Sequence, residues 1–407
     1  MTTRQCGPVV SSNIFSYSFY MVCFWAATFA VPVYLQIAGQ ENVVYNYSVL
    51  ISLASIAEGL LDYGIRGKYL KRLLDDHLQV ELRSMFITRL FSAFILIALL
   101  FIFVLFTDFK FHLIDVLTFT ILTIFGLSSN PFSNLLRLEG SIKLEAKILL
   151  LNRILFLGTL VIIGETRRIS FSELCLMLIL HHVITYFTFL FYSWPLVSKF
   201  SFTDSFSFNF RRFNRDFLTG LSLGLGMFYL KLPILAISIC EDALDKDNLC
   251  LLFTYLNILH MCVQIFWNLN HLHFSTLAIS GGAIIKKFLI LPFIVNSAFT
   301  SLVILFTFYI LSFNGATYYS FANIGYEFYG LAFAYALWTS LAKFQRFLFP
   351  LFNLESYEVI LAGIVVILLA IYYFLELQSY LFLVFLFLLI MEVIFVGIRN
   401  LLIIKSS

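Results

Sequence analysis

The residues whose types could do chemistry in this chain are the few charged side chains that interrupt its apolar segments. Lys231 stands in the middle of an apolar segment (217–240) that contains no other Asp, Glu, Lys or Arg. A cation that deep in hydrocarbon is costly, so it marks a functional site and calls for an anionic partner. Arg153 and Arg89 lie near the starts of two further apolar segments and could turn into the same interior. Together the three would form a basic lining suited to a phosphate or pyrophosphate group, unless the arginines extend to lipid headgroups.

Acidic side chains offer a second kind of chemistry. Glu58, Asp62 and Arg66 are spaced four apart, so they stack on one face of a helix. Asp62 and Arg66 could simply pair and anchor the helix end, whereas Glu58 could gate the protein or couple it to protons. Glu392 lies deep in the last apolar segment and needs a partner that the sequence does not identify.

Metal and covalent chemistry are not expected. His181 and His182 are adjacent, so on a helix they point about 100° apart, which argues against a shared metal. The six cysteines form no CxxC pair; Cys240 and Cys250 bracket an acidic loop and could form a disulfide, or could be small apolar helix residues. The chain has no G-x-S-x-G, P-loop or metalloprotease motif. We therefore predict no enzyme, no metal site and no cofactor.

The elements that must position these side chains are membrane-spanning helices. Hydrophobic residues make up 61% of the 407 residues and charged residues only 12%. A helix crosses the bilayer core with about 20 apolar residues, and helices satisfy their own backbone hydrogen bonds there. We predict an all-α integral membrane protein with about twelve spans. These lie at 13–35, 45–64, 86–106, 111–129, 148–164, 173–194, 217–240, 249–269, 288–311, 327–345, 359–376 and 381–402.

The distribution of positive charge predicts the orientation. Lys and Arg flanking short loops mark the cytoplasmic side of a membrane protein. When the N-terminus is placed inside, most of the 26 Lys and Arg fall in cytoplasmic loops and at the adjoining helix ends. The exceptions are Lys110, Arg167, Arg168 and Lys246, which fall outside, and the intramembrane Lys231. Both termini are therefore predicted to be cytoplasmic.

The spans divide six and six. Residues 1–197 form the predicted N-terminal bundle, 198–216 a polar cytoplasmic linker and 217–407 the C-terminal bundle. The first helix of each half carries a proline near its outer end, Pro32 and Pro233, and Gly224 loosens the seventh helix further. Repeats with such interrupted helices are typical of alternating-access carriers, although membrane helices tolerate Gly and Pro in general.

Aromatic residues could line a path for a sugar. The chain is 18% aromatic, and Trp25 and Tyr229 are candidates for stacking against sugar rings. Anchoring at the membrane interface would explain them equally well.

Two tracts carry a resemblance to a known family. Leu60–Arg66 (LLDYGIR), followed by a charged loop and a helix with Arg89, resembles the "D-aromatic-G" signature of Wzx-type polysaccharide flippases. Asn130–Lys143, with a proline followed by a glycine and a basic residue, resembles the inner loop between helices 4 and 5 of that family. The family belongs to the multidrug, oligosaccharidyl-lipid and polysaccharide (MOP) exporter superfamily, whose MATE-like fold has two six-helix bundles. Lys231 departs from the pattern, since many relatives carry an Asp there, so ion coupling is not carried over.

The resemblance implies a function. It points to a multi-pass protein of the bacterial inner membrane that moves undecaprenyl-pyrophosphate-linked O-antigen or capsule units to the periplasmic leaflet. Besides this lipid-linked oligosaccharide and membrane lipids, candidate partners are a polysaccharide polymerase and a chain-length regulator; no nucleic acid is expected. Lys231, Arg153 and Arg89 would attract the pyrophosphate, while Pro32, Pro233 and Gly224 would let helices bend. The alternatives are a membrane polysaccharide polymerase or glycosyltransferase, and an ion-coupled drug antiporter of the same superfamily.

Overall fold

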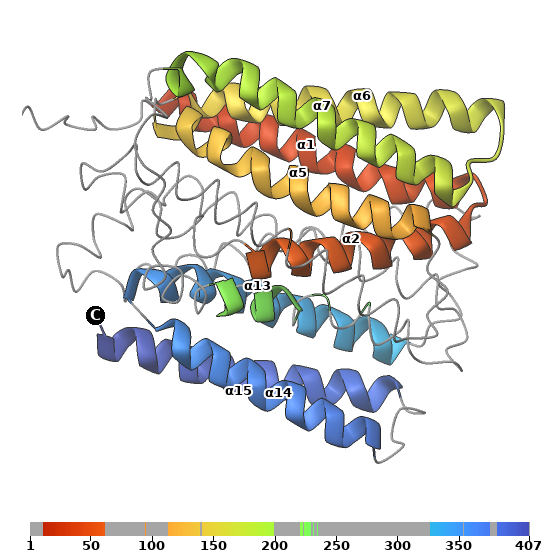
Figure 1. The fold of residues 1–407 in the computed structure, drawn as a ribbon. Coiled ribbons are helices and arrows are strands. Elements are labelled where there is room, and N and C mark those ends of the chain that lie inside the picture. The colour runs from red at the N-terminus through yellow and green to blue at the C-terminus, as the bar shows by residue number, and fades with distance from the viewer. Residues whose placement is uncertain are drawn as a thin grey trace, which may run out of the picture.

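The computed structural model describes a set of long helices that run alongside one another (Figure 1). The described residues are 11–61, 94, 113–138, 141–198, 220–222, 224–228, 231, 234, 326–352, 354–374 and 381–406. The long helices are α1 (Ser11–Ile37), α2 (Glu41–Leu61), α5 (Leu113–Leu138), α6 (Ile142–Thr166), α7 (Phe171–Val197), α13 (Tyr326–Phe352), α14 (Glu355–Phe374) and α15 (Leu381–Ser406).

Each of these helices overlaps one predicted apolar segment, so the prediction of helix at those places is confirmed. Five stretches in the described part are long and apolar enough to cross a membrane: Ser16–Ile37, Val43–Leu60, Ile142–Thr166, Phe171–Pro195 and Phe385–Ile403. The chain is therefore a multi-pass membrane protein. The predicted spans at 249–269 and 288–311 lie outside the described residues, as do 86–106 apart from residue 94 and most of 217–240.

One predicted loop is wrong. The tract from Asn130, expected to be an inner loop, continues α5 as helix to Leu138 in spite of Pro131. Its apolar residues Phe132, Leu135 and Leu136 keep helical spacing, and they are buried against residues of α6 and α7. Burial of three such side chains stabilises the extension by several kcal/mol, at about 1.5–3 kcal/mol each, enough to offset the roughly 3 kcal/mol cost of an internal proline.

The helices form two groups. Figure 1 shows α1, α2, α5, α6 and α7 together and α13, α14 and α15 together, and the most extensive contacts join α5 to α7, α1 to α6 and α13 to α15. A cluster of buried apolar side chains takes members from both groups, with Val31 and Phe156 in the first and Leu331 and Phe385 in the second. The outward-facing surface of the helices is apolar too, since the side chains of Ile162 and Leu401 are each 69% exposed. Since large apolar patches are rare on water-facing surfaces, this face suits lipid.

Short, hydrogen-bonded connections set how consecutive helices are oriented. The α1–α2 turn uses Gly39 at φ +69°, and the amide of Gln40 donates to the carbonyl of Leu35 at 2.9 Å, a Schellman-type helix end. Before α7, the amide of Ser170 donates to Glu173 at 2.9 Å and the amide of Glu173 donates to Ser170 Oγ at 3.3 Å. This reciprocal pair is a capping box, and it satisfies two amides at the helix start.

Candidate functional site

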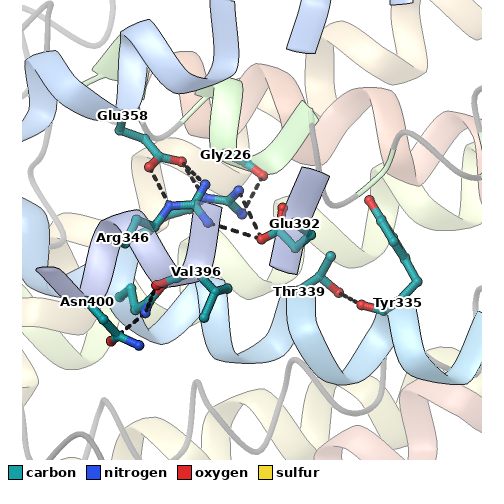
Figure 2. Close-up of polar contacts among 10 residues, drawn as sticks. Gly226, Tyr335, Thr339, Arg346, Glu358, Glu392, Val396 and Asn400 are labelled. Carbon is teal, nitrogen blue, oxygen red and sulfur yellow. Dashed lines mark hydrogen bonds and ion pairs between the residues drawn. The ribbon is translucent and has the colours of Figure 1, made fainter. Parts of the chain in front are cut away.

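A buried ion network joins α13, α14 and α15 (Figure 2). Arg346 on α13 donates from Nε to Oε1 of Glu358 on α14 at 2.6 Å. Arg399 on α15 donates from Nε to Glu358 Oε2 at 2.8 Å and from Nη2 to Oε1 at 3.0 Å. Glu358 is completely buried, and both of its oxygens are therefore held by guanidinium groups.

Glu392 completes the network from α15. Its Oε1 accepts a hydrogen bond from Arg399 Nη1 at 3.1 Å and lies 3.7 Å from Arg346 Nη2. Its other oxygen, Oε2, is buried and has no hydrogen-bond partner among the described residues. The partners that Glu392 needs are thus two arginines, both of which the charge pattern had placed with the cytoplasmic flanking charges. Both side chains are buried in the protein: Arg346 and Arg399 are 5% and 1% exposed.

The network balances two positive charges against two negative ones. Charged groups are taken into a membrane interior only with partners, since an unpaired buried ion costs several kcal/mol. Arg346 lies between both carboxylates (Figure 2). Next to these groups, Gln345 donates to Asn400 Oδ1 at 2.7 Å and to the carbonyl of Val396 at 3.1 Å. The three C-terminal helices are held in register by polar groups as well as by packing.

The network reaches the seventh predicted helix through a backbone contact. Arg346 Nη1 donates to the carbonyl of Gly226 at 3.3 Å. A Cβ on Gly226 would lie 2.8 Å from Arg346 Cδ, closer than real Cβ atoms come. Two residues away, a Cβ on Gly224 would meet Leu60 of α2, including its backbone Cα at 2.7 Å. The glycines allow this helical segment to touch both α2 and Arg346.

A second cluster surrounds Arg153 on α6. The Arg153 guanidinium carbon lies 5.6 Å from the ring centre of Phe24 and 5.5 Å from that of Phe156. The phenol of Tyr47 on α2 lies near enough to interact electrostatically with the guanidinium. The Phe156 ring in turn lies 5.1 Å from the ring of His181 on α7. The guanidinium of Arg153 therefore lies among side chains of α1, α2, α6 and α7, which corresponds to the inward of the two positions that the sequence left open.

The Arg153 cluster contains donors without acceptors. Arg153 Nε and Nη1 are buried and have no hydrogen-bond partner in the described part of the chain, and no carboxylate there forms an ion pair with it. The same is true of the amide nitrogen of Asn152, whose side chain is 6% exposed, and of the indole nitrogen of Trp25. Trp25 packs edge-on against Phe24 at 4.7 Å between ring centres. These groups could take an anionic or oxygen-rich ligand.

Some of the remaining predicted site residues are described by the structure, and the others are not. Lys231 is helical and partly buried. No carboxylate among the described residues pairs with it. Glu58 lies where a Cβ on Gly126 of α5 would be, so α2 and α5 approach closely there. Pro32 lies inside α1, which runs on to Ile37. Arg89, Asp62, Tyr229, Pro233 and the cysteines Cys240 and Cys250 lie outside the described residues.

His181 and His182 do not share a ligand in this arrangement. His182 Nδ1 donates to the carbonyl of Leu178 at 2.9 Å, and the two rings meet at 90°. In the part of the chain that the structure describes, no group of three His, Cys, Asp or Glu could hold a metal ion.

Solved structures share this arrangement of helices. One is a MOP superfamily transporter from Pyrococcus furiosus, described as having a binding pocket of reverse polarity; it is 14% identical, with 97% of this chain and 96% of that chain covered and a TM-score of 0.63. The chain has the MOP transporter fold. A multidrug resistance MATE family transporter in an outward-facing conformation matches it at 13% identity over 97% of this chain and 96% of that chain, with a TM-score of 0.62. A MATE structure in complex with MaL6 gives 14% identity, 97% coverage of both chains and a TM-score of 0.63.

At the level of sequence, no protein-family profile and no curated protein matches the chain. The likeness to MOP transporters therefore rests on the fold.

Sequence reasoning missed part of the MOP-fold interior. Arg346, Glu358 and Arg399 were not singled out, because each lies near a helix end, where flanking charges are ordinary. The available signal was Glu392, a carboxylate too deep to be unpaired. One partner, Arg399, lies two turns further along the same helix, and the other, Arg346, lies near the end of the neighbouring helix α13.

Proposed function

We propose that this protein is a transporter that flips polyprenyl-pyrophosphate-linked oligosaccharides, of O-antigen or capsule type, from the cytoplasmic to the periplasmic leaflet of the bacterial inner membrane. The observation that carries this proposal is the buried guanidinium of Arg153, two of whose nitrogens have no acceptor among the described residues. The MOP fold supplies the setting, since neighbours with this fold are described as transporters.

An unmatched cation favours an anionic substrate. Arg153 forms no ion pair with a described carboxylate, and Lys231 forms none either. A phosphate or pyrophosphate would supply the missing negative charge and several acceptor oxygens at once. A polyprenyl pyrophosphate could place this headgroup inside the protein while its tail stays in lipid.

The aromatic groups near Arg153 fit the sugar part of such a substrate. Phe24, Trp25 and Phe156 surround or adjoin the guanidinium, and the Trp25 indole N–H has no acceptor among the residues that the structure describes. Aromatic faces with a few polar groups are typical of pockets that bind amphipathic ligands. The reverse pocket polarity of the Pyrococcus transporter supports the view that charge in this fold varies with function.

The second candidate is an ion-coupled drug antiporter. It is favoured by the neighbours described as multidrug resistance transporters and by the Glu58 carboxylate between α2 and α5. A cationic drug, however, would have to bind near Arg153 against like charge. We therefore place this function second.

The deciding experiment measures binding and flipping by the purified, reconstituted protein. We expect undecaprenyl pyrophosphate to bind, undecaprenol to bind far more weakly, and Arg153→Gln to lower pyrophosphate affinity about tenfold or more, since a charge-assisted contact is worth about 1.5–3 kcal/mol. The matched control is Arg167→Gln, which removes an exposed arginine that pairs with Glu173 at 2.6 Å and should leave affinity unchanged. Equal binding of both lipids, or unchanged affinity in Arg153→Gln, would refute the proposal. Binding of a cationic dye that depends on Glu58 would support the antiporter.

A further inference from the structure

The ion network occupies one end of the helix bundle. Arg346 and Arg399 lie in the last third of α13 and α15, and Glu358 lies in the first turn of α14. Leu60 is the penultimate residue of α2. In Figure 1, the C-terminal ends of α2, α13 and α15 point to the same side, where the chain's C-terminus is marked. The positive-charge pattern predicts that this end faces the cytoplasm.

At this end, one short segment touches both groups of helices. Gly224 meets Leu60 of α2 in the N-terminal group, and Gly226 meets Arg346 in the C-terminal group. The Gly226 carbonyl accepts a hydrogen bond from Arg346 Nη1 at 3.3 Å. The segment, which belongs to the predicted C-terminal bundle, thus meets the N-terminal group at Leu60, at the end where a carrier must open to take up substrate from the cytoplasm.

Arg346 is suited to hold the segment because its other bonds fix its position. Its Nε is 2.6 Å from Glu358 Oε1, and its Nη2 is 3.7 Å from Glu392 Oε1. Arg399 shares both carboxylates, yet no contact of Arg399 with Gly224 or Gly226 is seen among the described residues. A guanidinium can bind two carboxylates and a carbonyl together because its donors point in different directions; an ammonium group is a single point charge.

We propose that Arg346, positioned by Glu358 and Glu392, is the latch that keeps the 224–228 segment against α2 and so closes the cytoplasmic end of the transport path. Opening toward the cytoplasm separates Gly224 from Leu60, and the Arg346–Gly226 contact holds the segment in the position that keeps them together. The inference concerns the closure of the path and holds for any substrate that the MOP fold carries.

The test is cysteine accessibility at the Leu60–Gly224 contact. Leu60→Cys is introduced into the full-length chain with its six native cysteines replaced by alanine, and inverted membrane vesicles are treated with a membrane-impermeant maleimide. Adding Arg346→Gln should raise the labelling rate about fivefold or more, as expected for a shift of population to the open state. Arg399→Gln is the matched control, since it removes a buried guanidinium from the same network without touching Gly226, and it should change the rate less than about twofold.

Two outcomes would overturn the proposal. Unchanged labelling in a folded Arg346→Gln protein would mean that Arg346 does not hold the segment, and equal increases in both arginine variants would mean general loosening of the bundle. Folding is judged by size-exclusion elution in detergent. If Arg346→Gln fails to fold, Arg346→Lys replaces it, because it keeps the charge beside Glu358 but loses the planar set of donors. Labelling of that variant should also rise, and an unchanged rate would count against the latch.

Discussion

Arg346 and Glu358 are bonded at 2.6 Å between α13 and α14, although the two residues are only 12 positions apart in the chain. The pair therefore closes the hairpin that these helices form. Because Arg399 binds the same carboxylate from α15, a single acidic side chain organises three helices.

This arrangement predicts unequal roles for the two buried carboxylates. Glu358→Gln should destabilise the protein by about 3–5 kcal/mol, because it leaves two buried guanidinium groups with one carboxylate. Glu392→Gln should cost less, since only one of its oxygens is bonded among the described residues. Thermal unfolding in detergent should place Glu358→Gln well below Glu392→Gln, and the reverse order would contradict the assignment of Glu358 as the central anion.

The close approach at Gly224 predicts a steric effect. Gly224→Ala places a Cβ 2.7 Å from the Cα of Leu60, so backbones must separate, at a cost of about 1–3 kcal/mol. The matched control is Gly158→Ala in α6, where an added Cβ meets no atom within 4 Å. That change should raise stability by roughly 0.5–1 kcal/mol, because alanine favours helix. Comparing the two melting temperatures tests the contact, and a Gly224→Ala protein as stable as the parent would disprove it.

The buried bond between Ser133 Oγ and Glu145 Oε1, 2.6 Å long, predicts coupling of α5 to α6. Ser133→Ala should cost about 1–3 kcal/mol, because Glu145 is 2% exposed and loses a donor. A double-mutant cycle with Glu145→Ala, which removes the acceptor, followed by unfolding in detergent, should give a coupling energy above about 0.5 kcal/mol. Strict additivity would show that the bond contributes nothing to stability.

At the start of α7, the capping box predicts a smaller change. Ser170→Ala removes the hydroxyl that accepts from the Glu173 amide, and should cost about 0.5–2 kcal/mol. Ser170→Asp restores an acceptor and should recover most of the loss. The measurement is again the melting temperature, and a loss in the alanine variant that aspartate does not restore would argue against capping.

The helices of the described part were largely predictable from the sequence, because long uncharged runs have few alternatives in a bilayer. The end of α5 was not. Pro131 and Gly140 indicate a loop locally, whereas burial of Phe132 and Leu136 between α6 and α7 extends the helix. That burial depends on how distant segments pack together, and the residues around Pro131 carry no information about such packing.

The same limit applies to the candidate site. For Arg153, near the start of its apolar segment, the sequence left open an inward position or an extension to lipid headgroups, and the structure places its guanidinium beside aromatic rings. The roles of Arg346 and Arg399 depended on how α13 and α15 cross. Charge at a helix end is compatible with lipid headgroups or with a buried partner, and only the contact with Glu358 distinguishes the two.

The tight turn at Gly39 also bears on how the protein is made. Since α1 ends at Ile37 and α2 begins at Glu41, the two helices cannot adopt independent orientations in the membrane. They therefore form an antiparallel hairpin, and the direction in which α1 crosses the membrane fixes the direction in which α2 crosses it. An error in the direction of the first helix during synthesis would therefore invert the second as well, and the pair serves as a single unit of topogenesis.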